Sequence, residues 1–190
     1  HIIVPYNNLA GLESIGSQTA AVLVEPIQSE SGYRAGNPEF LAAVQAACRR
    51  SGALLILDEI QCGFGRSGSL FAYQHYGLQP DILCLGKALG GGMPLGAFAS
   101  ARSLMHQLAH NPMLGHITTF GGHPVSCAAG NAALHLLQNG PELPDLRRKS
   151  LLLQNLLELL PHTTGISGTG FLWSVGVGSL DRAVRVQHAA

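Results

Sequence analysis

The chain has 190 residues, of which 46% are hydrophobic and 12% are charged, and its 11 basic residues balance its 11 acidic ones. This composition excludes a disordered protein, and zero net charge gives no electrostatic basis for binding nucleic acid or an anionic membrane. No apolar run approaches the roughly 20 residues that cross a bilayer, and the four cysteines lack a CxxC spacing, which favours reduced thiols and a cytoplasmic protein.

The first third of the chain predicts one strand and one helix. Residues 1–18 read as a connector that ends in a short helix, and no signal-peptide pattern precedes it. The apolar, β-branched run 19–25 predicts a strand buried on both faces, and the polar stretch 27–36 predicts a loop. A helix is expected over 37–51, because asparagine and proline stand at its start and Gly52 follows its end.

The middle of the chain predicts three further strands. The apolar runs 53–57, 81–85 and 95–99 have strand length and are separated by glycine-rich or polar segments. Between the first two runs, residues 63–68 predict a loop and residues 70–76 a short helix.

The last part of the chain is mainly helical in its pattern. We expect helices over residues 101–108, 125–137 and 146–160, with a loop at 117–124 before the second of them. Residues 171–177 predict a strand that belongs to another layer.

The alternation of strands and helices indicates an α/β fold with a mostly parallel sheet and helices on both faces. In such sheets, ligands bind outside the carboxyl ends of the strands. Glu25, Asp58 and Lys87 each lie at or just after the carboxyl end of a predicted strand. The sequence therefore predicts that residues able to do chemistry gather at one edge of the sheet.

Lys87 follows the strand at 81–85 and stands between Gly86 and the glycines at 90–92. It is one of only two lysines, and the other, Lys149, lies in a charged run. A lysine that is removed from water has a lowered pKa and attacks carbonyl groups. The alternative is a lysine at a strand end whose amine reaches solvent.

Asp58 closes the apolar strand at 53–57, and a buried carboxylate needs a cationic or hydrogen-bonding partner. One such partner is the protonated ring nitrogen of a pyridine cofactor, whose aldehyde could form a Schiff base with Lys87. The alternatives for Asp58 are a helix cap or an ion pair with an arginine.

These residues lie in motifs that resemble the class III aminotransferases, which are fold-type I enzymes dependent on pyridoxal 5'-phosphate. The resemblance is to the acetylornithine, ornithine and ω-amino-acid aminotransferase group, and it covers about residues 19–176. The motifs that carry it are Val24–Gln28, Leu57–Gly68, Pro80–Ile82, Gly86–Gly92 and Thr118–Pro124.

The resemblance implies a role for each site residue. Lys87 would hold the cofactor covalently and move the proton during the reaction, and Asp58 would bind the ring nitrogen. Gln61 would approach the phenolic oxygen, and Thr119 would bind the phosphate of the cofactor in the other subunit. In addition, Glu25 would lie near the active site, and Glu30 would pair with an arginine that reads a substrate carboxylate.

The expected activity is transfer of an amino group from an amine or ω-amino acid, acetylornithine- or ornithine-like, to a 2-oxo acid such as 2-oxoglutarate, in a homodimer with shared active sites. Residues 1–144 would be part of the cofactor-binding large domain, and residues 145–190 a linking helix and the start of a small α+β domain. The family's phosphate loop and its substrate-carboxylate arginine have no counterpart in the sequence, so we expect these 190 residues alone to be inactive.

Three other interpretations are open. The same scaffold could support an aminomutase or a decarboxylase, and a non-catalytic paralogue could keep the fold. A dinucleotide-binding oxidoreductase is disfavoured because no GxGxxG follows the first predicted strand. No metal is expected, since His106 and His110 have helical spacing but no evident third ligand.

Overall fold

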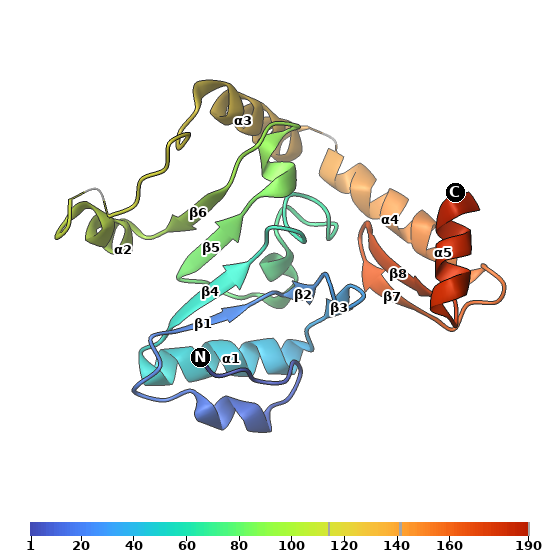
Figure 1. Cartoon of the computed structure of the whole chain (residues 1–190), viewed down its shortest axis with the longest axis horizontal. Helices are drawn as coiled ribbons and strands as arrows, with labels where there is room; N and C mark the ends of the chain where they lie inside the picture. Colours follow the sequence, from blue (N-terminus) through green and yellow to red (C-terminus); the bar gives the residue numbers. More distant parts are fainter. Residues whose placement is uncertain (114, 141, 190) are drawn as a thin grey trace.

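The computed structural model of the chain describes residues 1–113, 115–140 and 142–189. Its main sheet has the strand order β1-β4-β5-β6, formed by Ala21–Val24, Leu54–Asp58, Ile82–Leu85 and Ala97–Ser100 (Figure 1). β4 pairs in parallel with β1 and β5, whereas β6 is antiparallel to β5. The predicted α/β fold with a mostly parallel sheet is confirmed, and all four predicted strands are present.

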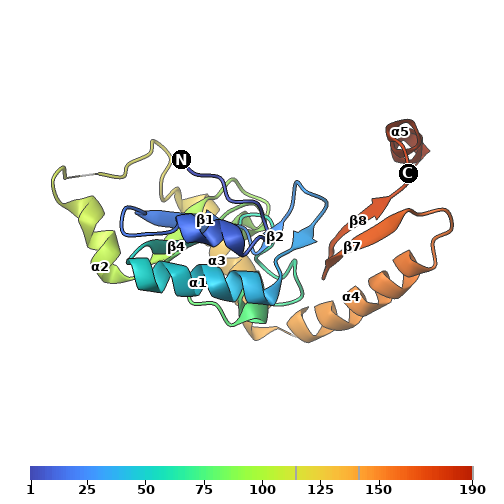
Figure 2. The ribbon, with the colours of Figure 1, turned by 90° about the horizontal axis from the view of Figure 1, so that it is seen from below.

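Helix α1, Pro38–Ser51, covers one face of this sheet (Figure 1 and Figure 2). It begins at a proline, as predicted, and ends where Gly52 adopts a left-handed conformation with φ of 78°. Alternate residues of the central strands point toward it, so that Leu57 is fully buried. The core between helix and sheet consists of Phe40, Leu41, Val44, Cys48, Leu55, Leu57, Leu78 and Leu83.

The opposite face of the sheet is more open at β1. Leu23 points away from α1 and is 66% exposed. The prediction that strand 19–25 is buried on both faces is therefore wrong for this chain. The physical reason is that side chains alternate along a strand, and α1 covers only the face that carries Val22 and Val24.

Short elements interrupt the segments predicted as loops. The 27–36 stretch contains the antiparallel pair β2, Ile27–Gln28, and β3, Arg34–Ala35. The short helices expected near residues 1–18 and 70–76 are 3-10 helices, η1 at Ala10–Ser14 and η2 at Ala72–Tyr76.

The chain after β5 makes a turn, returns as the edge strand β6 and then leaves the sheet. The 3-10 helix η3, Lys87–Gly90, follows β5, and β6 then leads to α2, Arg102–Met105, and the 3-10 helix η4, His106–Ala109. The return segment leads to α3, Pro124–Asn139 (Figure 1).

The C-terminal part lies to one side of the sheet (Figure 1 and Figure 2). It consists of α4, Glu142–Glu158, the antiparallel pair β7, Gly165–Thr169, and β8, Leu172–Gly176, and α5, Leu180–Ala189. The predicted strand at 171–177 is β8, whereas β7 and α5 were not predicted. No described helix has both the length and the apolar character needed to cross a bilayer.

The turn between β7 and β8 packs closely on the loop that follows β4. The backbone N–H of Phe171 donates to the carbonyl oxygen of Arg66 at 2.8 Å. Gly170 has φ of 61°, and a Cβ atom there would collide with that same carbonyl oxygen. The Ser167 hydroxyl donates to the carbonyl oxygen of Gly32 at 2.6 Å, although the two residues are 135 positions apart. The hairpin thus contacts two loops of the sheet-bearing part.

We predict that Gly170→Ala destabilises the chain, because the added methyl group needs space that the Arg66 backbone fills. The expected loss is about 1 to 3 kcal/mol in the free energy of unfolding, measured with urea. Gly16→Ala is the matched control, since a Cβ atom at Gly16 has no neighbour within 4 Å. Equal stability of both variants would contradict the close packing of the hairpin turn.

Candidate active site

Three of the predicted site residues lie at or just after the carboxyl ends of β1, β4 and β5, at one edge of the sheet (Figure 1). Asp58, the last residue of β4, lies opposite Cys84 of β5, and Lys87 follows β5 by two residues. Glu25 comes directly after β1, whose pairing with β4 is parallel. Neighbouring strands lie about 4.8 Å apart, so the backbones at these three positions are close together. The sequence-based expectation of a shared edge agrees with this register.

Lys87 stands where the chain turns away from the sheet. Its φ is 50°, a left-handed conformation that is uncommon for any residue except glycine. Such conformations gather at functional sites, where surrounding structure holds them in place. The side chain is exposed. Of the two alternatives for Lys87, the structure therefore favours an amine that reaches solvent, because β5 ends at Leu85 and the turn carries Lys87 beyond the buried strand.

Helix α3 packs against the turn that contains Lys87. A Cβ atom at Gly91 would lie 2.8 Å from the carbonyl oxygen of Ala129, and one at Gly130 would lie 2.8 Å from the carbonyl oxygen of Leu89. Both positions need glycine, because the two backbones approach each other too closely for a side chain. Gly91 thus serves close backbone packing, whereas a Cβ atom at Gly92 would have no neighbour within 4 Å.

Asp58 is half-buried and partly satisfied by its own loop. Its Oδ1 accepts a hydrogen bond from the backbone N–H of Ile60 at 2.9 Å. Within the described residues no hydrogen bond to Oδ2 is found, so this oxygen is available to a further donor. Within the described residues Asp58 forms no ion pair with an arginine.

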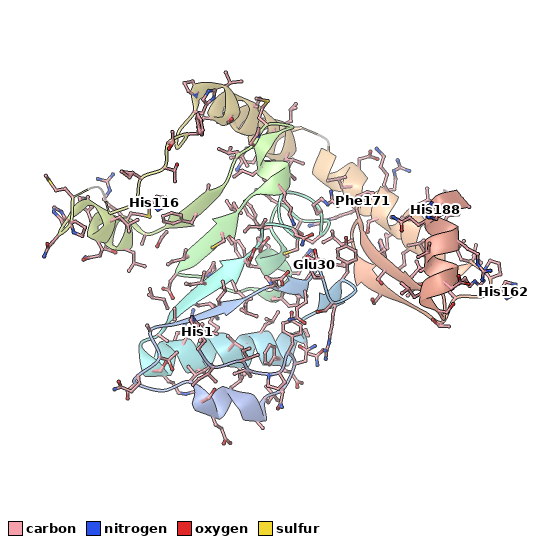
Figure 3. All side chains as sticks on the ribbon, in the orientation of Figure 1. His1, Glu30, His116, His162, Phe171 and His188 are labelled. Carbon is pink, nitrogen blue, oxygen red and sulfur yellow. The ribbon has the colours of Figure 1, made fainter. Side chains whose placement is uncertain are left out.

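Gln61 and Glu30 meet in the structure. Nε2 of Gln61 donates to Oε1 of Glu30 at 2.8 Å, and this contact joins the loop after β4 to the loop between β2 and β3. Figure 3 labels Glu30 near the centre of the view. Glu25 is half-buried, and its Oε2 accepts the backbone N–H of Ser29 at 3.1 Å.

Thr119 lies apart from this group of residues. It is exposed in a turn of the segment that returns from η4 to α3. His116 of the same segment packs edge-on against Phe98 of β6, with ring centroids 5.1 Å apart (Figure 3). This contact places the start of the return segment beside the antiparallel strand β6.

Glu59 is a residue of the site region that sequence reasoning missed. It is 1% exposed, and its two carboxylate oxygens accept the backbone N–H groups of Ala72 at 2.7 Å and Tyr73 at 2.6 Å. Its pKa is raised to about 7, mainly because the carboxylate is buried; the two backbone hydrogen bonds lower the pKa and the nearby Asp58 raises it, both to a smaller extent. Strand alternation was the available signal, because a residue next to Asp58 must point to the opposite side.

A lysine, a carboxylate and a glycine-rich turn thus lie at the carboxyl edge of a mostly parallel sheet, which is where α/β proteins bind small molecules. The sequence profile described as Aminotransferase class-III matches residues 2–186. The chain therefore belongs to the class III aminotransferase family.

Curated relatives support this assignment. The acetylornithine aminotransferase of Neisseria meningitidis serogroup A is 46% identical over 165 residues, which are 86% of this chain and 41% of that protein. The putrescine aminotransferase of Pectobacterium atrosepticum is 49% identical over 150 residues, which are 77% of this chain and 32% of that protein. The chain thus spans about two fifths or less of these relatives.

Solved structures share the fold. The ornithine aminotransferase of Toxoplasma gondii superposes with a TM-score of 0.83 at 34% identity, over 92% of this chain and 42% of that one. The acetylornithine aminotransferase of Elizabethkingia anophelis gives a TM-score of 0.79 at 37% identity, over 92% of this chain and 45% of that one.

Class III aminotransferases depend on pyridoxal phosphate, and the Toxoplasma structure is described with partial occupancy of this cofactor at its active site. The residues of this chain fit the reactive end of the cofactor. Lys87 offers a primary amine for the aldehyde, and Oδ2 of Asp58 is free to accept a proton donor such as the ring nitrogen.

We predict that Glu59 makes the folded chain less stable as the pH rises from about 5 to 8. Its pKa is 4.5 ordinarily and about 7 in the fold, so the folded state keeps a proton that the unfolded state releases between these values. The stabilisation is complete below the lower pKa and is lost as the pH rises through the higher pKa. The free energy of unfolding falls by on the order of 3 kcal/mol over this range. Urea unfolding at several pH values measures it.

Two variants separate Glu59 from other titrating groups. Glu59→Gln does not titrate and should flatten this pH dependence, whereas Glu13→Gln, at an exposed glutamate, should keep it. A slope that is the same in both variants would show that Glu59 titrates normally.

Proposed function

We propose that this chain forms the part of a class III aminotransferase that holds the reactive end of pyridoxal 5'-phosphate. The complete gene product would transfer an amino group from an amine or ω-amino acid, acetylornithine- or ornithine-like, to a 2-oxo acid such as 2-oxoglutarate. The observation that carries the proposal is the shared edge of Asp58 and Lys87, with Lys87 in a left-handed turn held by α3. The named relatives support the choice of donor class.

The cofactor, when bound, supplies an aldehyde and a protonated ring that takes up the electron pair released at the amino-bearing carbon. Lys87 would hold the cofactor through its aldehyde, and its amine, once the substrate amine has taken its place, would remove the proton from the amino-bearing carbon of the substrate. Asp58 would keep the ring nitrogen protonated by accepting its N–H at Oδ2. The two residues thus have complementary work, one on the substrate side and one on the ring.

The remaining site residues bind and orient. Gln61 donates its amide to the phenolic oxygen, a role supported by its place in the loop that follows Asp58. Thr119, on the exposed return segment, binds the phosphate in a partner subunit of a homodimer with shared active sites. Glu25 lines the site. Glu30, which already accepts a hydrogen bond from Gln61, pairs with an arginine that binds a substrate carboxylate.

The proposal also covers the domain boundaries and the cellular location of the protein. Residues 1–144 belong to the large, cofactor-binding domain, and residues 145–190 to a linking helix and the start of a small domain. Helix α4 supports this division, since it leads from the sheet to the β7–β8 hairpin, although it begins at Glu142. The protein acts in the cytoplasm, as the free cysteines of the described residues favour.

Lys87 is expected to be the residue that pyridoxal phosphate modifies. After incubation with the cofactor and reduction with borohydride, peptide mapping of the complete gene product should find the phosphopyridoxyl group on Lys87. Lys87→Ala should lose the adduct and the visible absorption band of the bound cofactor. Lys149→Ala is the matched control, because the second lysine forms an exposed ion pair with Asp145.

An adduct on Lys149 alone, or on neither lysine, would exclude the assigned role of Lys87. The assay of amino transfer then tests the reaction class: an aminotransferase requires the 2-oxo acid, whereas an aminomutase or a decarboxylase turns over without it.

Asp58→Ala should abolish amino transfer while part of the cofactor binding remains. The physical reason is that the ring nitrogen loses the carboxylate that keeps it protonated, so the ring no longer takes up the electron pair. A stopped-flow measurement of the first half-reaction tests this, with Asp58→Asn as a variant that keeps the size of the side chain. Wild-type rates in either variant would contradict the role of Asp58.

A further inference from the structure

The loop that carries Gln61 runs from the end of β4 to the start of η2. It contains three glycines, and Gly65 and Gly68 adopt φ values of 85° and 88°. Glycine loses more conformational freedom on folding than other residues, so a loop of this composition needs specific contacts to hold one shape. The position of Gln61 relative to Asp58 and Lys87 depends on those contacts.

Glu59 supplies contacts at both ends of this loop. Its side chain accepts the N–H groups of Ala72 and Tyr73, which stand at the far end of the loop. Its backbone N–H donates to the carbonyl oxygen of Cys84 in β5 at 3.0 Å, and its own carbonyl accepts the N–H of Gly63 at 3.0 Å. Glu59 therefore forms hydrogen bonds with the start of the loop, with its end and with β5, the strand that leads to Lys87.

The loop also packs against the residue before Lys87. A Cβ atom at Gly86 would lie 3.2 Å from the side chain of Ile60, which immediately follows Glu59. A shift of the loop at this point is therefore transmitted directly to the turn that begins at Lys87. Since Asp58, the last residue of β4, immediately precedes Glu59, movement at position 59 affects both predicted contacts of the cofactor.

We propose that Glu59 is a positioning residue, whose carboxylate holds the loop of residues 60–71 in the conformation that places Gln61 beside the strand ends carrying Asp58 and Lys87. The inference rests on the proposed function, because it assigns to Gln61 a contact with the cofactor. Glu59 itself is buried beneath the loop and acts through Gln61.

The chemistry of the contact requires a glutamate. Two N–H donors converge on the side chain, and the ionised carboxylate, which is the form present above its pKa of about 7, offers one acceptor oxygen to each. In Glu59→Gln one oxygen becomes an amide NH2 group, which faces an N–H donor and cannot accept its hydrogen bond. Glu59→Asp keeps both acceptors but is shorter by one methylene group, so it reaches the two N–H groups less well.

The test is a double-mutant cycle with Glu59→Gln and Gln61→Ala in the complete gene product. The probe is pyridoxal phosphate, and the readouts are its dissociation constant and the pH at which its visible absorption band changes. We expect Glu59→Gln to weaken binding about tenfold and to shift the pH of the spectral change in the same direction as Gln61→Ala. The double variant should differ little from Gln61→Ala alone, because the two residues act as one unit.

Glu13→Gln is the matched control and should bind the cofactor like the wild type. Independent, additive effects of the two substitutions, or wild-type binding by a folded Glu59→Gln variant, would overturn the inference. If the wild type itself binds no pyridoxal phosphate, the proposed function fails, and this outcome is distinct from a failure of Glu59 alone.

A measurement on the wild type covers the case in which Glu59→Gln does not fold. Hydrogen exchange of the Ala72 and Tyr73 amides should be slow, and addition of pyridoxal phosphate should slow it at least threefold further, because ligand and loop stabilise each other reciprocally. Fast exchange of both amides, or exchange unchanged by the cofactor, would overturn the role of Glu59.

Discussion

The parallel pairing of β4 with β5 is the constraint on which the site depends. It sets Asp58 opposite Cys84, so that the chain emerging from each strand turns at the same edge. Had β5 run antiparallel to β4, Lys87 would leave the sheet at the far edge, a strand length away from Asp58. The hydrophobic contact between these strands and α1 secures the pairing, because Leu57 and Leu83 belong to the same core.

The loops around the site are joined by contacts that cross between separate parts of the chain. Gln61 reaches Glu30, the β7–β8 turn reaches Arg66, and Ser167 reaches Gly32. The two loops that meet in the Gln61–Glu30 hydrogen bond therefore both rest on the same hairpin. Their mutual position follows from the C-terminal part of the chain as well as from the sheet.

Sequence reasoning located the four strands of the main sheet and α1, because apolar runs and helix-end residues are local signals. It missed β2 and β3, which have two residues each, and β7, which contains two glycines and shows no apolar alternation. The burial of Glu59 was out of reach, because it depends on two N–H groups that lie 13 and 14 residues further along the chain. For Lys87 the sequence left a buried and an exposed amine as alternatives, and the turn after β5 decides between them.

The close approach of α3 to the turn at Lys87 bears on the order of folding. Gly91 and Ala129 lie roughly forty residues apart along the chain, and closing a long loop costs more conformational entropy than closing a short one. The hydrogen bond from the N–H of Ile60 to Asp58, by contrast, forms within a few residues. We expect the ring-nitrogen side of the site to take shape early, and the lysine side to become ordered only when α3 docks.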